Sequence, residues 1–144
     1  MTAPRPNMHI LCRKLPTVLS EIDVFNGQVV DMLKDAGLSK EVFPVQMLLR
    51  ESINNAMIHG NAGQSARQVA VEVRIGRKLI IIRVEDEGAG FDWKRMRTTV
   101  PDATRTSGRG LPIYALYAKR TFFNKKGTQV TLVRGINGET HEPV

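Results

Sequence analysis

Residues 50–61 read RESINNAMIHGN, a stretch with helical periodicity that carries many polar side chains. At about 100° per residue, Glu51, Asn55 and His59 fall on one narrow strip, because each lies one helical turn after the last. The adjoining face is mainly apolar and comprises Val42, Val45, Leu49, Ser52, Ile53 and Ala56. The pattern predicts a carboxylate, an amide and an imidazole lined up along the edge of a hydrophobic core.

A simpler interpretation is a helix with a solvated polar edge. Gly60 and Asn61 tolerate the left-handed conformation that ends many helices, so His59-Gly60-Asn61 can be a plain C-terminal cap. The stretch alone leaves both interpretations open.

The residues before this stretch predict a strand and then a helix. Residues 8–14 can form the strand, and Pro16 suits the first turn of a helix. Apolar residues then recur at helical spacing as far as the stop at Gly37: Val18, Ile22, Phe25, Val29, Met32 and Leu33. Ser39 can cap the next helix, which carries the polar strip.

After the polar helix, the period of the pattern changes to two. Residues 69–75 alternate between apolar and polar, as in a strand with one buried face. Residues 79–85 are more continuously apolar, as expected of a central strand covered by helices. The short connection between them favours an antiparallel hairpin. A short helix through residues 114–117 and a second hairpin, residues 121–124 and 128–133, complete the pattern.

Strands and helices segregated in this way predict an α+β fold, a two-layer α/β sandwich with a mostly antiparallel sheet and helices on one face. With 144 residues, 42% hydrophobic and 24% charged, the chain suits one ordinary globular domain, residues 1–144, with flexible tails at about 1–7 and 136–144. We find no apolar run long enough for a bilayer and no signal peptide, which predicts a cytoplasmic protein without a membrane partner.

The net charge of +7 is unevenly distributed. Asp102 alone opposes a run of basic residues between Trp93 and Arg134: Lys94, Arg95, Arg97, Arg105, Arg109, Lys119, Arg120, Lys125, Lys126 and Arg134. Such an excess suits the phosphates of a nucleotide or a nucleic acid, and a solvated basic surface is the common alternative. The single Cys12 has no disulfide partner and no ligand pattern around it, so we expect a small buried residue on the first strand.

Asp86 ends the predicted central strand and is followed by Gly88 and Gly90. The glycines let the backbone turn sharply and approach a ligand closely. The carboxylate is a fixed hydrogen-bond acceptor, which could read an exocyclic amine such as that of adenine.

A second glycine pair, Gly108 and Gly110, precedes the short helix, with Arg109 between them. Free backbone N–H groups at a helix N-terminus favour phosphate. Two plain turns are the alternative interpretation of the glycine pairs, since such pairs are common in turns. The P-loop, dinucleotide-binding, calcium-loop and His-Glu-x-x-His motifs are all missing from the sequence.

In combination, Glu51-x-x-x-Asn55, Asp86-x-Gly88-x-Gly90, Gly108-x-Gly110-Leu111 and Gly127-Thr128 resemble the GHKL (Bergerat-fold) ATPase superfamily, which includes gyrase, MutL, a heat-shock chaperone and histidine kinases. Within it, the compact length is similar to the RsbW-like anti-sigma factor kinases. The resemblance implies a protein-serine/threonine kinase that binds ATP and Mg²⁺. It also implies regulation of transcription by partner switching, in which the kinase phosphorylates a STAS-domain anti-anti-sigma antagonist. A sigma factor as second partner and a homodimer fit the resemblance too.

The resemblance assigns roles to individual residues. Asn55 matches the ligand of Mg²⁺, and Glu51 the general base for the attacking hydroxyl. Asp86 matches the acid that binds the adenine amino group, and Thr128 lies near the adenine pocket. The remaining matches belong to a mobile ATP lid around residues 96–106, with Gly88 and Gly90 at its start and Gly108, Arg109, Gly110 and Leu111 at its far end. Within the lid, Arg97 and Arg105 are candidate contacts to the γ-phosphate, and solvated basic residues are the common alternative. His59 is assigned structural support.

Two alternatives share the fold. One is a nucleotide-dependent binding module without kinase activity, and the other is a stand-alone histidine-kinase-like ATPase domain. Nucleic-acid binding through the basic C-terminal third is disfavoured, because aromatic residues do not interleave with the charges.

Overall fold

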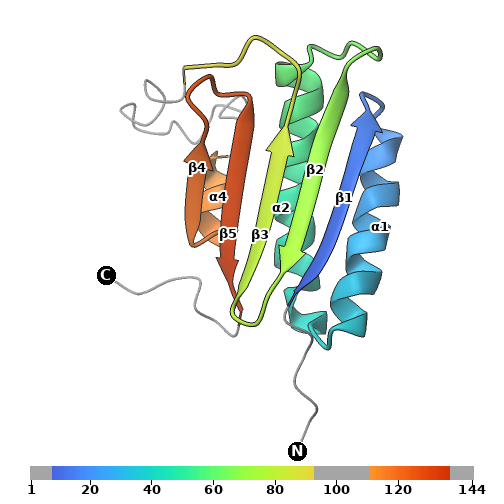
Figure 1. Ribbon diagram of the computed structural model, residues 1–144, viewed down its shortest axis with the longest axis vertical. Coiled ribbons are helices and arrows are strands. Elements are labelled where there is room, and N and C mark those ends of the chain that lie inside the picture. Colours follow the sequence, from blue (N-terminus) through green and yellow to red (C-terminus); the bar gives the residue numbers. More distant parts are fainter. Residues whose placement is uncertain (1–7, 93–110, 137–144) are drawn as a thin grey trace, which may run out of the picture.

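The computed structural model describes residues 8–92 and 111–136. Within these ranges, five strands form one antiparallel sheet in the spatial order β1-β2-β3-β5-β4 (Figure 1). The strands are β1 (His9–Pro16), β2 (Gln68–Ile75), β3 (Leu79–Glu85), β4 (Arg120–Phe123) and β5 (Gln129–Gly135). Both predicted hairpins, β2–β3 and β4–β5, are therefore confirmed.

The register of the sheet follows the two-residue repeat. Val73 pairs with Ile82, and Val84 pairs with Val130, so that apolar side chains from neighbouring strands are buried on one face. Because β3 has a neighbour on each side, it is the central strand that its apolar sequence predicts. Its pairing with β5 also joins the ends of the two hairpins, and the Asp86 backbone N–H donates to the Thr128 carbonyl at 2.9 Å.

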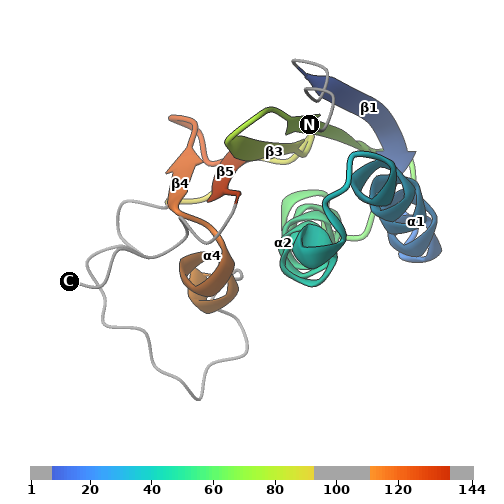
Figure 2. The same cartoon turned by 90° about the horizontal axis from the view of Figure 1, so that it is seen from below.

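The described helices all cover the same face of the sheet (Figure 2). They are α1 (Ser20–Asp35), the 3₁₀ turn η1 (Ser39–Glu41), α2 (Val42–Asn55), the π-helical turn η2 (Ala56–Gly60) and α4 (Leu111–Tyr117). A two-layer α+β sandwich with a mostly antiparallel sheet is thus confirmed. Among the described residues, we find no helix that is both long and apolar enough to span a membrane.

The first helix begins later than its sequence predicts. Pro16 is the last residue of β1, opposite Gln68, and α1 starts at Ser20. Since β1 is an edge strand, the missing N–H of a proline costs little there. Thr17 then bridges the gap, because its backbone N–H and its hydroxyl both donate to the Arg67 carbonyl.

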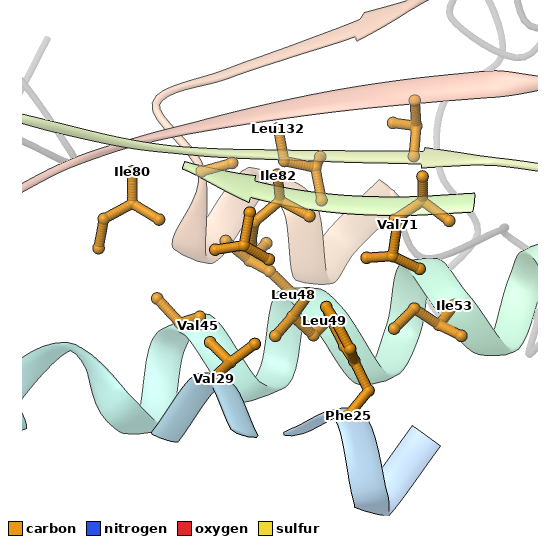
Figure 3. Close-up of a cluster of buried hydrophobic side chains, with 14 of the residues drawn as sticks. Phe25, Val29, Val45, Leu48, Leu49, Ile53, Val71, Ile80, Ile82 and Leu132 are labelled. Atoms are coloured by element: carbon orange, nitrogen blue, oxygen red, sulfur yellow. The ribbon is translucent and has the colours of Figure 1, made fainter. Parts of the chain in front are cut away.

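The hydrophobic core lies between the helices and the sheet (Figure 3). Leu49 and Ile53 of α2 are completely buried, as their helical spacing predicts, and so is Leu48; α1 contributes Phe25 and Val29. The sheet side of this cluster includes Val71, Ile80, Ile82 and Leu132. Burial of each such side chain contributes about 1.5–3 kcal/mol to the stability of the fold, so α2 is held firmly against the sheet.

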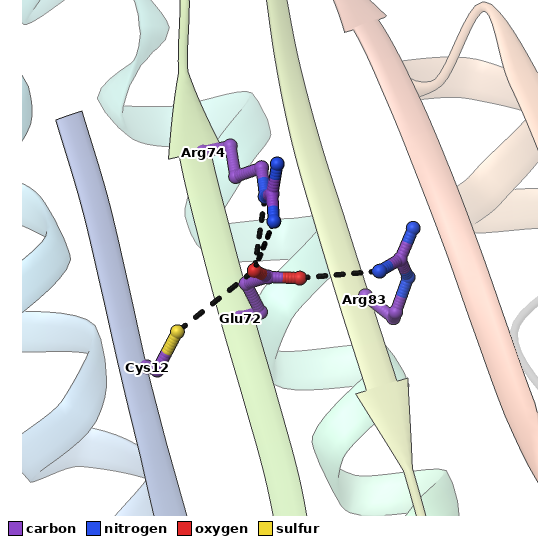
Figure 4. Close-up of polar contacts among 4 residues, drawn as sticks. All are labelled: Cys12, Glu72, Arg74 and Arg83. Carbon is purple, nitrogen blue, oxygen red and sulfur yellow. Dashed lines mark hydrogen bonds and ion pairs between the residues drawn. The ribbon is translucent and has the colours of Figure 1, made fainter. Parts of the chain in front are cut away.

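The opposite face of the sheet carries a polar cluster (Figure 4). Glu72 pairs with Arg74 at 2.9 Å and with Arg83 at 3.3 Å, and the Cys12 thiol lies 3.9 Å from its carboxylate. The prediction of a buried Cys12 is wrong, since this residue is exposed. The reason is the alternation along β1, in which Leu11 packs against the core and its neighbour therefore points away from it.

The ordered end of the chain extends one residue further than expected. The sequence predicts that Ile136 belongs to the polar tail, yet this residue is buried, and its N–H donates to the Lys78 carbonyl at 2.8 Å. This contact joins the end of β5 to the β2–β3 turn. The rest of the tail and residues 1–7 lie outside the described part of the chain.

Candidate functional site

A cavity lies where the end of α2 faces the ends of β3 and β5 and the helix α4. Its polar lining comprises Ser52, Asn55, Asp86, Tyr114, Thr128 and Gln129. Its apolar lining comprises Ala56, Val84, Phe91, Phe123 and Val130, together with the backbone of Gly127. The fold therefore brings together three residues that the sequence analysis selected from separate motifs: Asn55, Asp86 and Thr128.

Asp86 stands at the junction of the central strand and the glycine turn. Its Oδ1 accepts a hydrogen bond from the Gly88 N–H at 2.8 Å, which fixes the carboxylate at the cavity wall. A Cβ atom at Gly88 would collide with the Gly60 carbonyl, and a Cβ at Gly60 would collide with the Asp86 carboxylate. Close approach of neighbouring atoms therefore favours glycine at both positions, and Gly60 was not among the glycines selected from the sequence.

Gly90 completes the turn with a positive φ of 86°. The next residue, Phe91, donates its N–H to the Lys126 carbonyl at 3.1 Å, so the turn packs against the β4–β5 connection. The Phe91 and Phe123 rings meet edge to face, with centroids 5.2 Å apart. Together they form an apolar wall beside Asp86.

Thr128 is held by Asn124, a residue that the sequence analysis did not select. The Asn124 Nδ2 donates to the Thr128 Oγ1 at 2.8 Å, and its Oδ1 accepts from the Thr128 N–H at 2.8 Å. An asparagine four residues before a glycine-flanked threonine is a turn signal that could have been noticed.

The end of α2 departs from the predicted cap. Neither Gly60 nor Asn61 is left-handed, and the positive φ angles belong to Ala62 (52°) and Gly63 (69°). The chain instead widens into the π turn η2, in which the Asn61 N–H donates to the Ala56 carbonyl at 2.7 Å. Because the wider turn breaks the spacing of four, His59 leaves the strip shared by Glu51 and Asn55 and is exposed.

Asn61, which the sequence assigns only to a helix cap, has a second structural role. It is completely buried, and its Nδ2 donates to Thr17 Oγ1 and to the Gln68 carbonyl, both at 3.0 Å. Its Oδ1 accepts from the Glu87 N–H at 2.8 Å. The side chain therefore joins the end of the π turn to the residue after Asp86.

Glu51 and Asn55 lie one turn apart on α2 but border different hollows. Asn55 lines the cavity, where its Nδ2 donates to the Tyr114 hydroxyl at 3.4 Å. Glu51 is half-buried and lines a groove between α1 and α2, together with Leu19, Ile22, Asp23, Arg50 and Asn54. On α2, therefore, the Asn55 amide lines the cavity and the Glu51 carboxylate lines the groove.

The remaining predicted site residues belong to the expected lid and to its far end. Arg105, Gly108, Arg109, Gly110 and the expected lid at residues 96–106 lie outside the described residues. Leu111 begins α4, directly after that segment.

The cavity has the chemistry of a purine-nucleotide site. Asp86 offers an acceptor for an amino group between apolar and aromatic walls. An amide oxygen such as that of Asn55 suits Mg²⁺, which takes few protein ligands beside water and phosphate. The described residues contain no cluster of three or more acidic, histidine or cysteine side chains that could hold a metal alone.

The sheet has helices on one face, and Asn55 on α2 lies near the turn formed by Asp86 and Gly88 at the end of the central strand. This combination is typical of a nucleotide-binding domain of the ATPase class. The histidine kinase-like ATPase domain family matches residues 17–134, and the chain belongs to this family. Membership of this family implies that the chain binds ATP. No curated protein is detectably similar to the chain.

Proposed function

We propose that the protein is an ATP-dependent protein-serine/threonine kinase of the anti-sigma type. The observation that carries this proposal is the division of α2: Asn55 faces the nucleotide cavity, and Glu51, one turn earlier, faces a separate groove. A kinase needs this division, because the nucleotide and the phosphate acceptor approach the transferred group from opposite sides.

In this proposal Asp86 accepts a hydrogen bond from the adenine amino group, and Asn55 presents its Oδ1 to Mg²⁺. When bound with ATP, the cation neutralises charge on the phosphates. Glu51 accepts the proton of the acceptor hydroxyl. The side chains that line the groove are suited to a polypeptide acceptor, since Leu19 and Ile22 add apolar surface beside the carboxylate.

The rim of the groove is charged. Arg50 on α2 and Asp23 on α1 form an ion pair at 3.3 Å, and both side chains are largely exposed. A polar rim around an apolar floor is the usual composition of a protein-binding surface. The choice of a STAS-domain anti-anti-sigma protein as the acceptor comes from the resemblance of the motifs. A sigma factor as second partner and a homodimer also stay predictions.

The test is transfer of labelled γ-phosphate from Mg-ATP to purified STAS-domain proteins of the native host. We expect label on a serine or threonine of one of them, loss of transfer with Glu51→Gln, and loss of the tightening of ATP binding by Mg²⁺ with Asn55→Ala. The matched control is Glu85→Gln, an exposed carboxylate outside both hollows of α2, which should transfer normally.

Three results would count against the proposal. Transfer that survives Glu51→Gln would remove this residue as the base. ATP binding without transfer to any STAS-domain protein would favour a binding module of the same fold. Label on a histidine would favour the histidine-kinase-like alternative.

A further inference from the structure

Tyr114 is the aromatic residue that joins α4 to the functional end of α2. It is 3% exposed, lines the cavity, and its hydroxyl accepts a hydrogen bond from the Asn55 Nδ2 at 3.4 Å. The contact spans the cavity between two helices that are distant in the sequence. None of the sequence motifs includes this tyrosine.

The contact matters because an asparagine amide has two different ends. The Nδ2 only donates hydrogen bonds, and the Oδ1 only accepts them or binds a cation. An amide that is free to rotate presents either end to the cavity. A partner that accepts from Nδ2 selects one orientation and directs Oδ1 away from itself.

We propose that Tyr114 is a positioning residue for Asn55, which holds the amide with its oxygen directed toward Mg²⁺ bound with the nucleotide. This inference rests on the proposed role of Asn55. Residues that orient a metal ligand from behind commonly change metal affinity by about 10–100-fold when they are altered. The hydroxyl, and not the ring alone, carries the effect.

The position of Tyr114 is fixed by contacts at the far end of α4. Arg134 on β5 donates from Nη1 to the Tyr117 carbonyl at 2.8 Å and pairs through Nε with Glu41 at 2.6 Å. The Lys119 N–H donates to the Val133 carbonyl at 2.6 Å. Because Glu41 directly precedes α2, the same arginine ties α4 to the start of the helix whose end carries Asn55.

Packing offers a different explanation of Tyr114, because a buried ring stabilises a wall without any role for its hydroxyl. Tyr114→Phe separates the two explanations, since it removes only the oxygen. The matched control is Tyr117→Phe, which removes a hydroxyl from the next turn of the same helix. That hydroxyl has no hydrogen bond to a described residue, and the Tyr117 ring packs edge to face against Phe43.

The experiment is calorimetric titration of ATP into the full chain, once with Mg²⁺ and once with EDTA. We expect Mg²⁺ to tighten ATP binding by the wild type. Tyr114→Phe should weaken binding about tenfold in Mg²⁺ and leave it unchanged in EDTA. Tyr117→Phe should match the wild type in both. In the background of Asn55→Ala, which lacks the effect of Mg²⁺, Tyr114→Phe should have no further effect.

Two results would overturn the role of Tyr114 and leave the proposed role of Asn55 unchanged. One is a wild-type effect of Mg²⁺ that Tyr114→Phe retains or increases, because the hydroxyl would then be irrelevant or would compete with the nucleotide for Asn55. The other is an equal loss in Mg²⁺ and in EDTA, which is the result of a packing role. A wild type that binds ATP equally with and without Mg²⁺ would overturn the proposed role of Asn55 and, with it, this inference.

Discussion

The Oδ1 of Asn61 accepts a hydrogen bond from the backbone N–H of Glu87 at 2.8 Å, across 26 positions of the chain. The residue before Glu87 is Asp86, the acceptor in the cavity wall, and Asn61 directly follows the π turn that continues α2, the helix that carries Glu51 and Asn55. One buried amide therefore connects the two halves of the site.

The first prediction concerns Asn61→Ala. The substitution leaves the Glu87 N–H and the Gln68 carbonyl without their buried partner, so the free energy of unfolding should fall by about 2–4 kcal/mol. Urea denaturation measures the change. Asn54→Ala, at a half-buried position seven residues earlier, is the control and should change stability by less than about 1 kcal/mol. Equal stability of the two variants would mean that the hydrogen bonds of the Asn61 side chain do not stabilise the fold.

The second prediction compares two ion pairs. Arg134 and Glu41 are 12% and 7% exposed, whereas Arg50 and Asp23 are 60% and 73% exposed. Glu41→Gln breaks the buried pair and leaves the Arg134 charge without its carboxylate partner. We therefore expect a loss of about 3–5 kcal/mol in the free energy of unfolding. Breaking the exposed pair with Asp23→Asn should cost at most about 1 kcal/mol.

Urea denaturation of both variants measures the difference. The double replacement of Glu41 by Leu and Arg134 by Met should recover most of the loss, since no buried charge is then unpaired. If the two single variants lost equal stability, the buried pair would not anchor α4.

The third prediction concerns glycines. Gly88→Ala should destabilise the protein by about 1–3 kcal/mol and abolish ATP binding, because its Cβ would meet the Gly60 carbonyl. Gly27→Ala is the matched control. It lies on the exposed side of α1 with open space around it, and should stabilise the protein by about 1 kcal/mol. Thermal unfolding with and without ATP tests both, and ATP binding that survives Gly88→Ala would contradict the tight turn.

The hydrophobic patterns of the sequence were sufficient to predict the layers, both hairpins and the central strand. Residues such as Val73 and Ile82 are buried by a period that is visible in the sequence itself. The prediction for Cys12 was wrong because the face to which a side chain points depends on the register of its strand. A shift of one residue in that register moves the side chain to the opposite face of the sheet.

The site was predicted less completely. Asp86, Gly88 and Asn55 belong to short motifs with a direct chemical meaning, and the fold brings them together. The roles of Asn61 and Tyr114 could not be found in this way, because each acts through a contact with a partner on another element, whereas Asn124 carried only a turn signal. The π turn at Ala56–Gly60 was also missed, since a helical pattern does not distinguish an i+4 from an i+5 hydrogen bond.

The central claim is that the cavity receives the adenine of ATP against Asp86. The most direct measurement is the affinity of the wild type and of Asp86→Asn for ATP and for GTP, by calorimetric titration in Mg²⁺. A carboxylate accepts from the amino group of adenine and repels the carbonyl oxygen at the same position of guanine. We therefore predict that the wild type prefers ATP by about tenfold or more, and that Asp86→Asn loses most of this preference. An unchanged preference in the variant would contradict the assignment of this cavity as the adenine site.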